Sequence, residues 1–122
     1  MKNWELVKMY NALTNKTLQE SKTVLPTVVL VAKMKNIRVL TPYMQEWELA
    51  KNELIKQFGT KNEENGNYSV SLENSDFIAE FDKLNNINHA ELDELVMYVK
   101  VEELPKEMNP QEFELLSTMV NL

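Results

Sequence analysis

One long apolar stripe does most to limit how this chain can fold. Between residues 26 and 58, apolar side chains recur every three or four positions, the spacing that places them on one face of an α-helix. They are Leu30, Met34, Ile37, Leu40, Met44, Trp47, Ala50, Leu54 and Phe58. Pro26 suits the first position of such a helix, and Gly59 suits its end. The pattern predicts a helix over 26–58, roughly 50 Å long if unbroken, that serves as the spine of the domain.

A proline interrupts this stripe. Pro42 has no backbone N–H to donate to the carbonyl of Arg38, and a proline inside a helix kinks or breaks it. We therefore expect one of two arrangements around residues 38–42. Either a single helix is kinked there, or two helices meet there.

Three further helices are predicted. The first covers residues 3 to about 20, and the second covers about 74–85. The last has the clearest start, because Asn109 can cap it, Pro110 takes its first position and Glu112 completes a capping-box-like pattern. Three of its apolar side chains are expected to face inward, namely Phe113, Leu116 and Val120.

Two regions predict strands. Asn65-Gly66 is a strong signal for a tight hairpin turn, with strands at about 60–64 and 67–71. Residues 95–102 are rich in β-branched and aromatic side chains and predict one later strand. The expected fold class is therefore α+β and mainly helical, with about four helices and a small antiparallel sheet.

The length and composition restrict the function. A chain of 122 residues fits one domain, 1–122. It has no cysteine, which excludes disulfides, thiolate nucleophiles and cysteine zinc sites. The N-terminus lacks the apolar region of a signal peptide, and the longest apolar run, residues 24–32, is too short to span a bilayer. We expect no membrane contact and a cytoplasmic location.

No constellation of residues points to catalysis, a cofactor or a metal. His89 is the only histidine, and it is expected to be an exposed loop residue. Gly66 lies among carboxylates and amides as in a calcium loop, but Lys61 and Leu72 then occupy ligand positions that need carboxylates. We therefore expect a protein that is not an enzyme and that has no cofactor.

The charge is unevenly distributed. Residues 1–59 hold nine Lys and Arg against five Asp and Glu, a net +4, whereas residues 60–122 hold four against fourteen, a net −10. The acidic half could dock a basic partner or pair head to tail with a second copy, or it could be a solvated surface with no partner. The candidate partner-binding residues are Glu91, Asp93, Glu94, Glu102 and Glu103.

A short basic stretch lies on the expected long helix. It consists of Lys33, Lys35 and Arg38 and could touch phosphate groups. Cations interleaved with core residues are more typical of a solvated helix face, and the acidic remainder of the chain repels nucleic acid. We therefore expect no nucleic-acid binding.

The order of these features resembles a known family. The chain begins with "LVKMYNAL", continues through "LP" and a long charged helix ending in "LIKQFG", and then reads "ENGNYSV", "FIAEFDKLNN", "VKVEEL" and "NPQEFELL". This order is similar to that in a family of small uncharacterised proteins encoded by phages and prophages of Gram-positive bacteria. The resemblance runs from about Trp4 to Val120 and carries over no catalytic residues.

The resemblance implies a non-catalytic phage accessory protein that acts by binding proteins. The first hypothesis is a structural or morphogenesis component, found in the virion or in an assembly complex. The alternative is an anti-defence inhibitor, for example of a CRISPR or restriction system, that binds a host defence protein through the acidic C-terminal half. The expected partners are thus a phage assembly component, a host defence protein or a second copy, in the host cytoplasm or the virion.

Overall fold

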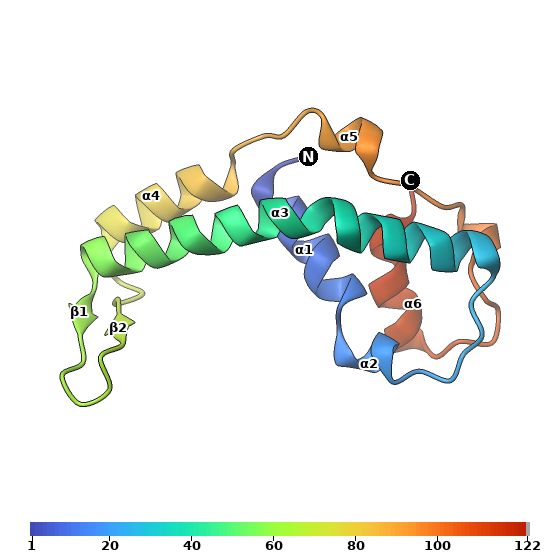
Figure 1. Ribbon diagram of the computed structural model, residues 1–122, viewed down its shortest axis with the longest axis horizontal. Helices are drawn as coiled ribbons and strands as arrows, with labels where there is room; N and C mark the ends of the chain where they lie inside the picture. The colour runs from blue at the N-terminus through green and yellow to red at the C-terminus, as the bar shows by residue number, and fades with distance from the viewer. Residues whose placement is uncertain (122) are drawn as a thin grey trace.

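A single long helix forms the spine of the molecule (Figure 1). The computed structural model describes residues 1–121, and in it α3 runs from Thr27 to Phe58. The helix continues through Pro42, so the expected split into two helices does not occur. Next to the proline, the Thr41 hydroxyl donates to the carbonyl oxygen of Ile37 at 2.6 Å. Pro26 occupies the N-cap rather than the first helical position.

Gly59 ends α3, but it does not take the left-handed conformation that is typical of a glycine at a helix end. Its backbone is extended, with φ −98° and ψ −178°, and not left-handed. A Cβ at this position would lie 2.5 Å from the carbonyl oxygen of Ser69 and closer still to that of Ile55. The absence of a side chain therefore allows the chain after α3 to fold back closely against the helix end.

The N-terminal segment forms two helices where one was predicted. α1 spans Asn3–Leu13, and the short α2 spans Lys16–Gln19. The chain leaves the helix at Thr14 and Asn15, and the Asn15 side chain accepts a hydrogen bond from the Thr17 N–H at 2.9 Å. Asparagine favours such an N-cap over a helix interior, which explains why the apolar spacing alone extends the helix too far.

The hairpin is present, but its strands are shorter than predicted. β1 is Thr60–Lys61 and β2 is Tyr68–Ser69, and they pair antiparallel. The predicted two-residue turn is wrong, because a loop over residues 62–67 joins the strands, closed by the Asn62 N–H to the Asn67 carbonyl at 2.7 Å. Within the described chain only Gly66 has a positive φ, 73°. Asn65 therefore does not take the left-handed conformation that a two-residue turn requires.

The helices predicted over about 74–85 and from Pro110 are present, although the second ends at Leu116, before Val120. α4 spans Ser75–Asn85 and α6 spans Pro110–Leu116. Asn109 accepts from the Glu112 N–H at 2.8 Å, as the capping pattern predicts. One detail is wrong, because Phe113 is exposed, whereas Glu112 is buried and accepts hydrogen bonds from the hydroxyls of Ser21 and Thr23.

The predicted strand at 95–102 is wrong. The helix α5, Leu92–Leu95, occupies its start, and the 3₁₀-helix η1, Val101–Glu103, occupies its end. The residues between them are extended, but their backbone hydrogen-bonds to a side chain of α3 and not to a neighbouring strand. The buried Asn36 amide donates to the Met97 carbonyl at 2.8 Å and accepts from the Met97 N–H at 2.7 Å. A single parallel bridge then joins Val99 to Val120, just after the 3₁₀-helix η2, Ser117–Met119.

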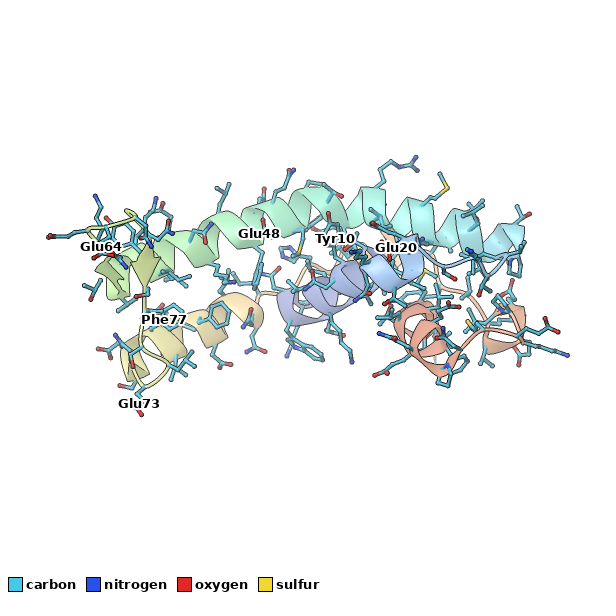
Figure 2. All side chains as sticks on the ribbon, turned by 90° about the horizontal axis from the view of Figure 1, so that it is seen from below. Tyr10, Glu20, Glu48, Glu64, Glu73 and Phe77 are labelled. Carbon is cyan, nitrogen blue, oxygen red and sulfur yellow. The ribbon has the colours of Figure 1, made fainter. Side chains whose placement is uncertain are left out.

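The elements form two layers. α3 lies along one side of the molecule, and α1, α4 and α6 lie on the other (Figure 2). The main core lies between α3, α1 and α6, and its fully buried side chains include Leu6, Leu13, Val29, Leu40, Leu92, Leu116 and Met119. A smaller aromatic cluster joins the far half of α3 to α4 and consists of Trp47, Phe58, Phe77 and Phe81. Figure 2 shows no helix of residues 1–121 on the side of α3 that points away from α1, α4 and α6.

Candidate protein-binding surfaces

The five predicted carboxylates lie in two groups. Glu91, Asp93 and Glu94 are at α5, whereas Glu102 and Glu103 are at η1, near the N-terminal end of α3 (Figure 1). The extended residues 96–100 separate the two groups. The sequence therefore identifies acidic positions that do not form one patch.

Glu91 holds two parts of the fold together. Its carboxylate accepts a hydrogen bond from the Tyr43 hydroxyl of α3 at 2.8 Å. The pKa of Glu91 is lowered by its own backbone N–H and then by this hydroxyl, because both stabilise the ionised form. The same hydrogen bond raises the pKa of Tyr43. Near neutral pH Glu91 is thus ionised and Tyr43 is protonated.

Asp93 also has an internal partner. Its Oδ1 accepts a hydrogen bond from the α-ammonium group of Met1 at 3.1 Å, and the same group donates to Asn88 Oδ1 at 3.0 Å. The Met1 residue is buried. This contact fixes α5 to the start of the chain, so part of the Asp93 charge is used within the fold.

His89 is half-buried rather than exposed, which corrects the expectation. The Asn3 amide nitrogen donates to the Leu84 carbonyl at 2.8 Å, which directs the Asn3 oxygen toward His89 Nε2 at 2.9 Å. Because that oxygen can only accept, His89 Nε2 carries the proton of this hydrogen bond. The ring also lies edge-on to Tyr43, with centroids 4.9 Å apart. His89 therefore joins α1, α3 and the segment before α5.

The remaining carboxylates are more available. Glu103 accepts from the Lys100 N–H at 2.9 Å and so caps η1. Glu94 and Glu102 are exposed, and their carboxylates have no hydrogen bond or ion pair with any residue from 1 to 121. Of the five predicted positions, these two have carboxylates that are free to meet a partner.

An uncovered apolar surface lies near the start of α3. Leu30, Val31 and Met34 lie on the outer face of α3 with exposed fractions of 43%, 47% and 63%. Residues 30, 31 and 34 occupy adjacent positions on a helix surface, so the three side chains form one patch. The sequence assigns Leu30 and Met34 to the buried stripe, whereas the buried positions here are Val29, Ala32 and the other core residues.

Basic side chains accompany this apolar patch. Lys33, Lys35 and Arg38 lie within or just after this part of α3, and none of them has a carboxylate partner among the described residues. Arg38 is exposed and lies one helical turn after Met34. We call Val31, Met34 and Arg38 the outer stripe of α3.

A second uncovered surface lies beside α1. Trp4 and Tyr98 are 49% and 37% exposed and line an open pocket of about 260 Å³ together with Glu5 and Lys8. No residue of α3 lines this pocket. Trp4 and Tyr98 come from opposite ends of the sequence, so no local pattern predicts that they meet. We call this site the aromatic pocket.

Residues 1–121 were compared with the requirements of a metal site and of a membrane-spanning helix, and they meet neither. In this part of the chain no three His, Asp or Glu side chains come together in a way that could hold a metal ion. None of its helices is long and apolar enough to cross a membrane.

The structure thus presents three features that a partner could contact. They are an apolar and basic face on α3, an aromatic pocket beside α1, and the free carboxylates of Glu94 and Glu102. In comparisons with known proteins, the chain matches no protein-family model, no curated protein and no solved structure.

Proposed function

We propose that this chain is a phage-encoded, non-catalytic accessory protein that acts by binding other proteins, as a structural or morphogenesis component. The resemblance in the order of its sequence features supports the phage origin. The single observation that carries the binding role is the outer face of α3, where Leu30, Val31 and Met34 lie together and uncovered.

The exposure of these three side chains to water costs free energy. Covering a half-exposed Leu, Val or Met side chain is worth about 1 kcal/mol, roughly half the value for complete burial. Clustered apolar side chains surrounded by polar ones are typical of protein-interaction sites, whereas single exposed ones need no explanation. Three neighbours on one rigid helix can therefore contribute a few kcal/mol to binding without any change in the fold.

The polar network around Glu91 supports a role other than catalysis. A general acid or base works best with a pKa near the operating pH. The pKa of Glu91 is lowered and that of Tyr43 is raised, so both move away from neutrality. The network instead connects α3 to α5 through the Tyr43–Glu91 hydrogen bond.

The test is recovery of the chain with phage particles. We expect it to copurify with virions or with a stable assembly complex, as measured by quantitative mass spectrometry. Met34→Glu places a charge in the apolar patch and is expected to reduce recovery at least about tenfold. Leu72→Glu is the matched control, because Leu72 is an 85% exposed leucine on the loop after the hairpin. Absence of the wild-type chain from both preparations would contradict the proposal.

A second candidate function is favoured by the free carboxylates. An anti-defence inhibitor that binds a basic host protein through its acidic half would use Glu94 and Glu102, since these have no partner within residues 1–121. Rim charges mainly accelerate association and make it sensitive to salt.

This candidate is tested by capture of a host defence protein from infected cells. It predicts that Glu94→Gln and Glu102→Gln weaken the capture and that added salt does the same. Glu103→Gln is the comparison variant, because its carboxylate already caps η1. Capture that is insensitive both to salt and to these changes would reject the electrostatic version.

A further inference from the structure

The unpaired charges of α3 change sign along its length. Lys33, Lys35 and Arg38 lie in its first half, and Glu46 and Glu48 lie in its second half. None of these five side chains makes an ion pair with another residue of the described chain. The residues between positions 38 and 46 have no charged side chain. The helix therefore has a positive end and a negative end, separated by an uncharged middle.

The other charges in the second half have partners within the chain. Glu53 and Lys56 pair with each other, with Oε1 and Nζ 3.7 Å apart. The Lys51 ammonium group lies 5.2 Å from the centroid of the Trp47 ring, and that ring packs against Phe81 of α4. Within this half of α3, the carboxylates left for a partner are thus the two at positions 46 and 48.

Two exposed apolar side chains are placed evenly about the middle of the helix. Met34 and Leu49 are the most exposed large apolar side chains of α3, at 63% and 68%. Met34 lies seven residues before Thr41, and Leu49 lies seven residues after Pro42. They are fifteen residues, about four turns, apart and so lie on the same outer face. A helix turned end over end about its middle therefore places each of these side chains opposite the other.

We propose that this chain forms a two-fold symmetric dimer in which the outer faces of two α3 helices pack antiparallel, with the axis beside Thr41 and Pro42. The occupant of the uncovered face is thus the same face of a second copy. The inference rests on the proposed function and deepens it, because it names the partner that the outer face of α3 binds.

Antiparallel packing brings complementary groups together. Met34 of each copy meets Leu49 of the other. Lys35 and Glu46 are eleven residues, about three turns, apart and share one edge of the face. Because a two-fold axis brings each edge against the same edge of the partner copy, Lys35 of one copy lies beside Glu46 of the other. Arg38 is one turn nearer the axis and contacts the same carboxylate.

The charge pattern identifies a second copy as the occupant. The apolar pair and the charged groups are both arranged about the same point of α3, so the face is complementary to itself in reverse. A parallel pairing would place Lys35 beside Lys35 and Glu46 beside Glu46, and like charges across an interface are unfavourable. A contact from residue 31 to residue 52 is roughly 30 Å long at 1.5 Å per residue. Since both copies use the same surface, the assembly closes at two.

Sedimentation velocity of the purified wild-type chain, over a series from micromolar to millimolar, measures the assembly. We expect monomer and dimer in exchange, with no larger species. Lys35→Glu and Glu46→Lys each place two like-charged pairs in the contact, and each is expected to weaken dimerisation at least about tenfold. The matched controls are Lys22→Glu and Glu73→Lys, which make the same charge changes at exposed positions outside α3. Circular dichroism melts verify that each variant folds, and Arg38→Glu replaces Lys35→Glu if that variant does not.

The decisive measurement is a mixture of the two defective variants. When a Lys35→Glu chain pairs with a Glu46→Lys chain, both ends of the contact again bring unlike charges together. We therefore expect an equimolar mixture to form a heterodimer about as tightly as the wild type forms its dimer, although each variant alone stays largely monomeric.

Cysteine crosslinking determines the orientation of the helices. The chain has no cysteine, so an introduced one reports only its own position. An oxidised mixture of Met34→Cys and Leu49→Cys chains should give a disulfide-linked dimer with one chain of each kind. Met34→Cys alone should give little linked dimer, because the two copies of residue 34 are separated by roughly 22 Å along the helices.

Four results would overturn the inference. They are a wild-type chain that stays monomeric throughout the series, a Lys35→Glu variant that dimerises like the wild type, a mixture that dimerises no better than its components, and a Met34→Cys chain that links to itself more than to the Leu49→Cys chain. These failures are distinct from failure of the proposed function. A monomeric chain that is still recovered with virions removes only the self-association. A dimer that is absent from virions and assembly complexes removes only the phage structural role.

Discussion

At the scale of single residues, polar side chains join parts of the chain that are distant in sequence. Asn36 provides the partner for Met97, and Asn3 provides one for His89, 86 residues away. Such contacts explain why the acidic positions were predicted and their surroundings were not. A carboxylate can be recognised in the sequence, but the side chain that meets it depends on how the helices pack.

Asn36 gives the first prediction. Its amide makes two hydrogen bonds to the backbone of Met97 and is fully buried. Asn36→Ala leaves the N–H and the carbonyl of Met97 without these partners, and we expect the free energy of unfolding to fall by roughly 2–3 kcal/mol. Chemical denaturation measures this change. Asn52→Ala, at an exposed position on the same helix, should change it by no more than about 0.5 kcal/mol. Equal effects of the two substitutions would show that the Asn36 bridge is dispensable.

The hydrogen bond between Tyr43 and Glu91 predicts a dependence on pH. Because the pKa of Glu91 is lowered in the folded chain, its stabilising effect is complete above its unfolded value of 4.5 and is lost as the pH falls through the folded value. Tyr43→Phe should raise the pKa of Glu91 toward its usual value and make this acid-induced loss smaller. NMR titration of the carboxylate and melting curves from pH 6 to about pH 3 measure both effects. An unchanged Glu91 titration in Tyr43→Phe would contradict the assignment.

At the scale of elements, a helix start was predicted more accurately from the sequence where capping residues mark it. The start of α6 at Asn109 and Pro110 was predicted correctly, because capping is a local interaction. The structure of segment 95–102 was not predicted correctly. Its β-branched side chains indicate an extended backbone, but they do not show which residues that backbone hydrogen-bonds to. Residues 96–100 are extended as expected, yet their partners are Asn36 and Val120 rather than a neighbouring strand.

The continuity of α3 through Pro42 is another element-level result. Proline removes one hydrogen bond and crowds the preceding turn, so local rules favour a break. Here the turns on both sides of Pro42 are held by packing, since Leu40 is fully buried and Met44 nearly so. Tertiary contacts thus maintain the helix against its local preference.

Replacing the proline is expected to stabilise α3. Pro42→Ala restores the missing backbone hydrogen bond at an exposed position within α3, and we expect the free energy of unfolding to rise by roughly 1–3 kcal/mol. Gln45→Ala, one turn later on the same exposed face, is the matched control and should have little effect. If Pro42→Ala destabilised the chain, the proline would have a structural role that the packing around it does not explain.

At the scale of the whole molecule, the spine joins two regions of unequal size. The main core lies between α3, α1 and α6, whereas α4 meets the far half of α3 through a small aromatic cluster. Figure 1 shows the hairpin at the same end of α3. Regions with less buried apolar surface open at a lower free energy. We therefore expect α4 and the hairpin to open locally while the main core stays folded.

Native-state hydrogen exchange tests this division. The amides of α4 should exchange faster than those of α1. Phe77→Ala removes a buried ring from the aromatic cluster, which is worth roughly 3 kcal/mol, and should accelerate exchange in α4 while leaving α1 nearly unchanged. Equal acceleration in both helices would mean that the molecule unfolds as one unit.

The central claim is that the outer face of α3 binds protein, and photo-crosslinking during infection tests it most directly. A photoreactive amino acid at Val31 should form a covalent product with a second copy of the chain or with a phage structural protein. The same amino acid at Gln111, an exposed position on α6, serves as the control and should form little product. Strong crosslinks from position 111 with none from position 31 would contradict the claim.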